Sequence, residues 1–194
     1  LEYMTATGNS TLAQLRRKNG RDKPFRVNYF AVGNEAWGCG GNMRPEYYAD
    51  QFRQVASFLK TPQDNRPVII ASGGNGMQTE WTETLSKGVY GAKASSHHSH
   101  TLSTGKWEHK CSAVGFPESE WISTLANVQH IDEIINKNSA VLDKNDPSKK
   151  IGFYFDEWGS WYDHDPDSNP RFLVQRNTLR DALLKSGRPI VFSI

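Results

Sequence analysis

The sequence has few cysteines, no long apolar run and no concentration of charge. Cys39 and Cys111 are its only cysteines, too few for a disulfide scaffold. No run of about 18 apolar residues occurs, so no membrane-spanning helix is expected. The net charge is +2, and the densest basic run, Arg16-Arg17-Lys18, is expected to form a solvated face. We therefore expect neither a membrane protein nor a protein that binds nucleic acid.

An apolar targeting segment is also missing at Leu1, where the sequence begins without methionine. We expect a piece of a longer polypeptide, with a cytoplasmic location slightly favoured over secretion. The 37% hydrophobic content of the 194 residues is enough for one domain with a core. Six Trp, seven Tyr and nine Phe suit either that core or the C–H faces of a sugar, so aromatic content alone does not decide between them.

Short apolar segments alternate with amphipathic segments along the chain. The apolar segments are rich in β-branched and aromatic residues, and strands are expected at 27–32, 67–72, 92–96, 151–155 and 189–194. We expect the strand at 27–32 to be buried. The amphipathic segments repeat their apolar residues at helical spacing, and helices are expected at 45–60, 79–87, 119–142 and 172–185.

This alternation predicts an α/β fold with a parallel sheet and right-handed crossovers. A doubly wound open sheet and a piece of a (β/α)₈ barrel both fit the pattern. The glycine fingerprint of dinucleotide-binding folds follows none of the expected strands, which weakens the first alternative. A complete barrel has about 250 residues, so the 194 residues present would form only part of one.

Acidic residues follow two of the expected strands. Glu35 comes shortly after the strand at 27–32, and Asp156-Glu157 follows the strand at 151–155. Because the carboxyl ends of parallel strands all lie at the same end of a sheet, Glu35 and Glu157 are expected to converge there. A carboxylic acid facing a carboxylate is the arrangement that hydrolyses a glycosidic bond. The alternative is that both are ordinary strand-end acids without a catalytic role.

Side chains suited to sugar binding flank the two glutamates. Trp37 and Trp158, with Trp161 close by in the sequence, would supply apolar walls for a sugar ring. Asn34 immediately precedes Glu35 and would donate a hydrogen bond to a hydroxyl next to the reacting carbon. These residues favour the catalytic interpretation of the two carboxylates.

Two segments resemble those of a known enzyme family. Residues 28–43, continuing into 45–49, closely resemble the acid/base segment of the α-L-arabinofuranosidases of glycoside hydrolase family 51. Residues 155–159, with Trp161 and Tyr162, resemble the nucleophile segment of that family. The resemblance covers nearly the whole chain from Glu2 to Ala182. An Asn-Glu pair alone is shared by many barrel glycosidases, whereas the stretch through Gly40-Gly41 is specific.

The resemblance implies that residues 1–194 form an incomplete catalytic (β/α)₈ TIM barrel, with about strands four to eight, and that the family's accessory β-sandwich is absent. It implies a retaining enzyme that releases terminal α-L-arabinofuranosyl residues from arabinose-containing oligosaccharides or polysaccharides. In that enzyme Glu35 would be the acid/base and Glu157 the nucleophile, and Asn34 would bind the 2-hydroxyl of arabinose. It implies neither a cofactor nor a metal.

The segment Ser96-His97-His98-Ser99-His100 departs from the family pattern. The family has Ser-x-His-x-Tyr there, and its His and Tyr line the sugar site beside the nucleophile. His98 matches that histidine, while His100 replaces the tyrosine; we expect both to bind the substrate. A charged imidazole at His100 would shift the pH profile. A zinc site that adds His109 and Cys111 to these histidines is an alternative, although the spacing fits no standard zinc pattern.

A partial barrel leaves two strand edges and an apolar helix layer uncovered. We therefore expect the chain to pair with other chains, including copies of itself. Two hypotheses about function remain: a glycosidase, and a catalytically silent fragment or sugar-binding remnant of one. Cys39 lies in the matched segment and is expected to be a small packed residue near the site.

Overall fold

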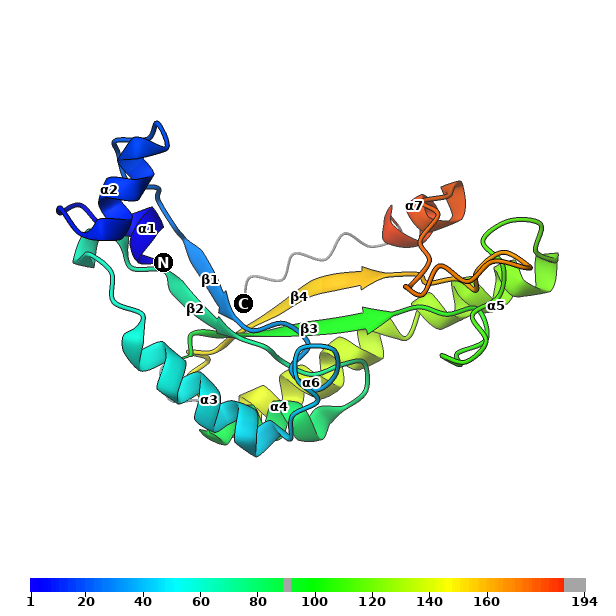
Figure 1. Ribbon diagram of the computed structural model, residues 1–194. Coiled ribbons are helices and arrows are strands. Elements are labelled where there is room, and N and C mark those ends of the chain that lie inside the picture. The colour runs from blue at the N-terminus through cyan, green and yellow to red at the C-terminus, as the bar shows by residue number, and fades with distance from the viewer. Residues whose placement is uncertain (89–91, 187–194) are drawn as a thin grey trace.

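The computed structural model describes residues 1–88 and 92–186, and within them four parallel strands form one sheet (Figure 1). The strands are β1 (Tyr29–Val32), β2 (Val68–Ala71), β3 (Ala94–His100) and β4 (Gly152–Gly159), in the spatial order β1-β2-β3-β4. Within the described residues this sheet does not close on itself. The prediction of a partial, parallel α/β barrel is therefore confirmed. The strand expected at 189–194 lies outside the described residues.

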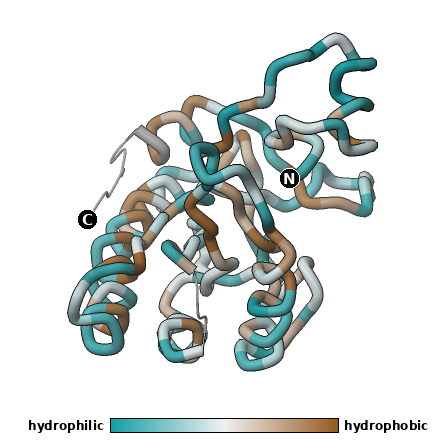
Figure 2. Tube along the Cα trace, turned by 90° about the vertical axis from the view of Figure 1, so that its left-hand side faces the viewer, coloured by the Kyte–Doolittle hydropathy of each residue, from teal (hydrophilic) through white to brown (hydrophobic). Residues whose placement is uncertain are grey.

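Seven helices accompany the strands in the described residues, and some of them cover one face of the sheet. They are α1 (Glu2–Thr5), α2 (Thr11–Lys18), α3 (Pro45–Phe58), α4 (Thr79–Gly88), α5 (Glu118–Val128), α6 (Ile131–Asn145) and α7 (Leu179–Ser186), with a 3₁₀ turn, η1 (Gln63–Asn65). Figure 1 shows α3, α4 and α6 along one side of the sheet, and the turned view in Figure 2 shows them side by side. None of the helices in the described residues combines the length and the apolar character that crossing a bilayer requires.

The face opposite these helices is concave. Tyr29 on β1 and Tyr154 on β4 belong to the two outermost strands, yet their ring centroids are 5.9 Å apart in an edge-to-face contact. Neighbouring strands are about 4.8 Å apart, so β1 and β4 are separated by three such spacings, and the curvature of the sheet turns the two rings toward each other across this face. The sheet is therefore rolled as in a barrel, with its interior open.

The core lies between the sheet and its helices in two clusters. One cluster packs β1 and β2 against α3 and α4, and its largest side chains are Tyr48, Phe52 and Trp81. The Tyr48 hydroxyl donates to the Val32 carbonyl (2.6 Å) and accepts from the Ser72 amide (2.6 Å), so it joins the carboxyl ends of β1 and β2. The other cluster packs Phe153 and Phe155 of β4 against α6.

Three of the strands differ from their predicted form. The first was expected to be buried, but β1 is an edge strand and Tyr29 is 59% exposed. The strand expected at 92–96 extends through His100, and the one expected at 151–155 extends through Gly159. These extensions pair with each other, which the polar composition of both segments concealed.

Two helix boundaries were also wrong. The helix expected at 119–142 is interrupted at Gln129 and His130, whose amides donate to carbonyls three residues back, and it continues as α6. The helix expected at 172–185 begins only at Leu179. There Thr178 acts as the N-cap: its amide and hydroxyl donate to the carboxylate of Asp181, three residues on.

The basic run at the end of α2 is not fully solvated, as had been expected. Arg16 has no exposed surface, and its guanidinium donates to the carbonyls of Tyr3, Ala6, Arg21 and Asp22. A buried cation needs such partners because desolvation disfavours charge. Arg16 therefore holds α1, α2 and the following loop together.

Candidate active site

The loop after β1 places Glu35 through backbone contacts. Glu35 has φ +44, a left-handed conformation that is uncommon for a residue with a side chain. Its carbonyl accepts from the amides of Gly38 (2.8 Å) and Gly40 (3.0 Å), and the next amide, that of Ala36, donates to the Ser72 hydroxyl (3.2 Å). A Cβ at Gly40 would lie 1.7 Å from the Asn34 carbonyl oxygen, so the turn requires glycine there.

A β-bulge places Glu157. His97 pairs with Phe155 and His98 pairs with Glu157, so Asp156 is an extra residue in β4. Successive strand residues point to opposite faces, and without the extra residue Glu157 would share the helix-covered face with Phe155. The bulge turns Glu157 to the concave face, where its Oε2 lies 3.4 Å from Nδ1 of His98.

The two carboxylates meet at the carboxyl end of the sheet around two histidines. One oxygen of Glu35, one of Glu157 and a ring nitrogen of His100 all lie within 4.8 Å of one another. His98 Nδ1 is 3.0 Å from Glu35 Oε1, and its Nε2 is 3.3 Å from Asp156 Oδ1. His100 Nε2 is 3.4 Å from Glu157 Oε1. The convergence of Glu35 and Glu157, which the strand ends predicted, is present in the structure.

The two histidines carry different charges. Burial lowers the pKa of His98, but its hydrogen bonds with Asp156 and Glu35 and the charge of Glu157 outweigh that effect and raise the pKa to about 9. His100 is also buried, and burial lowers its pKa despite the neighbouring charges of Glu157 and Glu35. At neutral pH His98 is therefore a cation between carboxylates, whereas His100 is neutral. The shift of the pH profile that a charged imidazole at His100 would cause is therefore not expected at neutral pH.

Opposing effects act on the pKa of the Glu35 carboxyl group. Burial raises its pKa, but hydrogen bonds from His98 and from the thiol of Cys39, together with the charge of His98, lower it further than burial raises it. Cys39 Sγ lies 3.2 Å from Glu35 Oε2, and Cys39 is exposed rather than packed as expected. The contacts of Cys39 and Asp156 with this cluster were missed by sequence reasoning. The only hints in the sequence were that Asp156 adjoins Glu157 and that Cys39 follows Glu35 by four positions.

The remaining predicted sugar-binding residues have different surroundings. Asn34 is exposed and adjoins Glu35 in the sequence. Trp37 packs against the core cluster formed by β1, β2, α3 and α4, and its Nε1 is buried without a hydrogen-bond partner. Trp158 packs near Phe155 and lines a cavity of about 580 Å³ that also reaches α5, α6 and His100. The structure therefore places Trp158 beside the carboxylates and not among them. Trp161 is closer, with its ring centroid 5.6 Å from that of His100.

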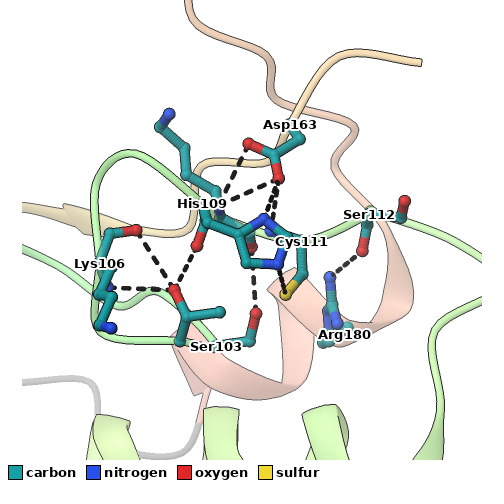
Figure 3. A network of polar contacts seen from close by, with 9 residues as sticks. Ser103, Lys106, His109, Cys111, Ser112, Asp163 and Arg180 are labelled. Atoms are coloured by element: carbon teal, nitrogen blue, oxygen red, sulfur yellow. Dashed lines mark hydrogen bonds and ion pairs between the residues drawn. The ribbon is translucent and has the colours of Figure 1, made fainter. Parts of the chain in front are cut away.

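The residues of the alternative zinc site fall into separate groups. Figure 3 shows His109 and Cys111 together with Asp163, in a network of their own. His109 Nδ1 is 3.1 Å from Asp163 Oδ2, and Cys111 Sγ is 3.8 Å from His109 Nε2. Asp163 also accepts from the amides of Lys110 and Cys111. This network anchors the loop after β3 to the segment after β4, apart from His98 and its carboxylates.

Parallel strands covered by helices, with two carboxylates meeting at their carboxyl ends, define a segment of a (β/α)₈ barrel that carries its active-site edge. Comparison with known proteins specifies the family. A family described as "Alpha-L-arabinofuranosidase 1 domain" matches residues 1–110. An intracellular exo-α-L-arabinofuranosidase from Bacteroides ovatus is 42% identical over 187 residues, which cover 96% of this chain and 36% of that relative.

Solved structures of similar proteins point to the same family. The GH51 arabinofuranosidase from Xanthomonas axonopodis pv. citri is 47% identical with a TM-score of 0.87, and the match covers 95% of this chain and 38% of the other. The family 51 arabinofuranosidase AbfB from Bifidobacterium longum is 25% identical with a TM-score of 0.73 over 96% of this chain and 39% of its own. The chain therefore belongs to the α-L-arabinofuranosidases of glycoside hydrolase family 51. It spans little more than a third of the length of these relatives.

Proposed function

We propose that this chain carries the catalytic pair of a retaining glycosidase that releases terminal α-L-arabinofuranosyl residues from arabinose-containing oligosaccharides or polysaccharides. The separation of Glu35 and Glu157 supports this most directly, because oxygens of the two groups lie within 4.8 Å of each other. Retaining glycosidases hold their carboxyl groups about 5–5.5 Å apart, whereas inverting ones leave about 6.5–9.5 Å for a water molecule. Family membership supports the choice of arabinofuranosyl as the sugar.

The two glutamates have different roles in the proposed double displacement. Glu157, which projects from β4 beside neutral His100, attacks the anomeric carbon and forms a covalent glycosyl-enzyme. Glu35 protonates the leaving oxygen in this step and then, as a carboxylate, removes a proton from the water that releases the sugar. The charged imidazole of His98 contacts both carboxylates and fixes their positions relative to each other. No cofactor or metal enters either step.

The surroundings of the pair fit this proposal. Asn34 is exposed next to Glu35, where it would reach the 2-hydroxyl of the bound sugar. Trp161, at 5.6 Å from His100, would form an apolar wall on the Glu157 side. Because hydrogen bonds to His98 and Cys39 outweigh burial and lower the pKa of Glu35, the protonated acid is abundant only at acidic pH. We therefore expect turnover to decline as the pH rises to neutrality. The name of the Bacteroides ovatus relative supports an intracellular location.

Hydrolysis of p-nitrophenyl α-L-arabinofuranoside by the 194-residue chain and by its Glu157→Ala variant tests the proposal. We expect nitrophenol release by the chain, none by the variant, and a first-formed arabinose of the substrate's own anomeric configuration by NMR. A product of inverted configuration would contradict the retaining mechanism. Arabinose binding without hydrolysis in both proteins would support the alternative, a catalytically silent, sugar-binding remnant.

A further inference from the structure

The two carboxylate oxygens of Glu35 have different partners. Oε1 accepts from Nδ1 of His98 at 3.0 Å, and Oε2 accepts from the thiol of Cys39 at 3.2 Å. Because His98 already donates to Oε1, protonation is favoured on Oε2, and a general acid would deliver its proton from there. The thiol therefore contacts the oxygen on which the proposed chemistry depends.

Cys39 is held at this oxygen by the same turn that fixes Glu35. The Glu35 carbonyl accepts from the amides on both sides of Cys39, those of Gly38 and Gly40. The backbone of Cys39 is thus tied to the backbone of Glu35, and the side chains lie four positions apart on one side of the turn. The thiol is also exposed and forms no disulfide.

We propose that Cys39 is a positioning residue, whose thiol holds Oε2 of Glu35 in the orientation used for proton transfer. The inference rests on the proposed function in assigning that transfer to Glu35. The thiol stays protonated, because the hydrogen bond to Glu35, with burial and the charge of Glu35 adding to it, raises the pKa of Cys39. Cys39 therefore acts as a hydrogen-bond donor and not as a nucleophile. Donation to the ionised form also favours the carboxylate that the second step requires.

The hydrogen bond itself is testable without turnover, from the rate at which iodoacetamide alkylates each cysteine as the pH rises. The thiolate displaces iodide, so the midpoint of the rate profile reports the pKa of the thiol. Mass spectrometry of the peptides separates Cys39 from Cys111, which is buried and serves as the internal control. We expect Glu35→Gln to lower the midpoint of Cys39 and to leave that of Cys111 unchanged.

A matched variant controls for charge alone. Glu46 lies exposed in the first turn of α3, and Glu46→Gln removes the same charge at a side chain that does not contact Cys39. We expect Glu46→Gln to leave the midpoint of Cys39 in place. An unchanged midpoint in Glu35→Gln, or an equal fall in both variants, would overturn the proposal.

The consequence for turnover is tested with Cys39→Ala and Cys39→Ser. Loss of one hydrogen bond predicts a fall of about two- to tenfold in kcat/KM for Cys39→Ala. The basic limb of its pH profile should also move to higher pH, because Glu35 loses a donor that lowers its pKa. Cys39→Ser restores a donor and should recover both. A Cys39→Ala profile that coincides with the wild type would overturn the proposal. Absence of turnover in the wild type would instead refute the proposed function, and the thiol midpoints would still decide whether the hydrogen bond exists.

Discussion

His98 and Glu35 are joined by a hydrogen bond of 3.0 Å that crosses the carboxyl end of β2, because His98 lies on β3 and Glu35 on the loop after β1. On β4, Glu157 Oε2 lies 3.4 Å from the same nitrogen, Nδ1, and Asp156 Oδ1 lies 3.3 Å from the other ring nitrogen, Nε2. One side chain thus connects Glu35 and Glu157, the two proposed catalytic carboxylates, across the curved sheet. The positive charge of His98 also offsets the repulsion between the carboxylates that surround it.

The first prediction is that His98 is charged at neutral pH. Contacts with three carboxylates outweigh burial and raise its pKa to about 9, so NMR titration of the imidazole nitrogens should find it protonated at pH 7. Asp156→Asn should lower that pKa, because a hydrogen-bonded charge is removed. Asp163→Asn, which affects the neighbour of His109 instead, is the control and should leave His98 unchanged. A pKa of His98 at or below 6.5 in the unaltered protein would show that burial prevails.

The second prediction concerns the nucleophile. Glu157→Ala should abolish turnover, because no covalent glycosyl-enzyme forms without the carboxylate. Azide should restore turnover by occupying the vacated space, and it should yield an arabinosyl azide of inverted configuration. Product NMR distinguishes this azide from arabinose. Azide rescue of Asp156→Ala by the same product would show that the bulge residue, and not Glu157, is the nucleophile.

The third prediction concerns the acid. Glu35→Ala should reduce kcat/KM by about 10²–10⁴-fold on substrates with poor leaving groups, such as arabino-oligosaccharides. Aryl arabinofuranosides with acidic phenols leave without protonation, so their first step should be nearly unaffected. Kinetics over a series of phenols of rising pKa measures the difference. Equal losses over the whole series would mean that Glu35 is not the acid.

Periodicity and strand-end chemistry predicted most of the fold and the meeting of the two glutamates. They did not predict the bulge at Asp156, because one extra residue changes the face of Glu157 without leaving a mark on the local pattern. A strict alternation of faces from Phe153 would have placed Glu157 against the helices. The role proposed for Glu157 therefore comes from the family resemblance and not from the strand pattern.

The start of α7 and the burial of Arg16 show a different limit. The Thr178-x-x-Asp181 capping signal was present in the sequence, yet the weak amphipathic pattern upstream of it suggested an earlier start. The partners of Arg16 are backbone carbonyls, which carry no side-chain signature. Such contacts depend on the path of the chain and cannot be inferred from residue types.

The fourth prediction concerns stability at low pH. His97 has no exposed surface; burial lowers its pKa to about 4, against the hydrogen bond with the Gly76 carbonyl that raises it. In the unfolded chain the pKa of histidine is about 6.5. Between these values the unfolded state binds more protons, so the free energy of unfolding falls as the pH drops through this window. The loss should reach about 3 kcal/mol near pH 4.

Urea unfolding at pH 7 and pH 4 measures this loss. His97→Gln cannot titrate and should lose less stability between the two pH values than the unaltered protein. Asn138→Ala removes a buried amide that also donates to Gly76, without changing any titrating group, and should keep the full pH dependence. If the pH dependence of His97→Gln matched that of the unaltered protein, another group would be responsible.

The last prediction is that the isolated chain self-associates. In the described residues no strand pairs with the outer edges of β1 and β4, and Tyr29 stands 59% exposed on one of them. Unpaired edges with aromatic side chains invite strand pairing between molecules. Sedimentation velocity at rising concentration should therefore show oligomers. Tyr29→Lys should reduce them, because a charge on an edge strand opposes pairing, whereas Tyr47→Lys alters a similarly exposed tyrosine on α3, away from the edge, and should not. A compact monomer that binds little hydrophobic dye would mean that the open edges are protected in the free chain.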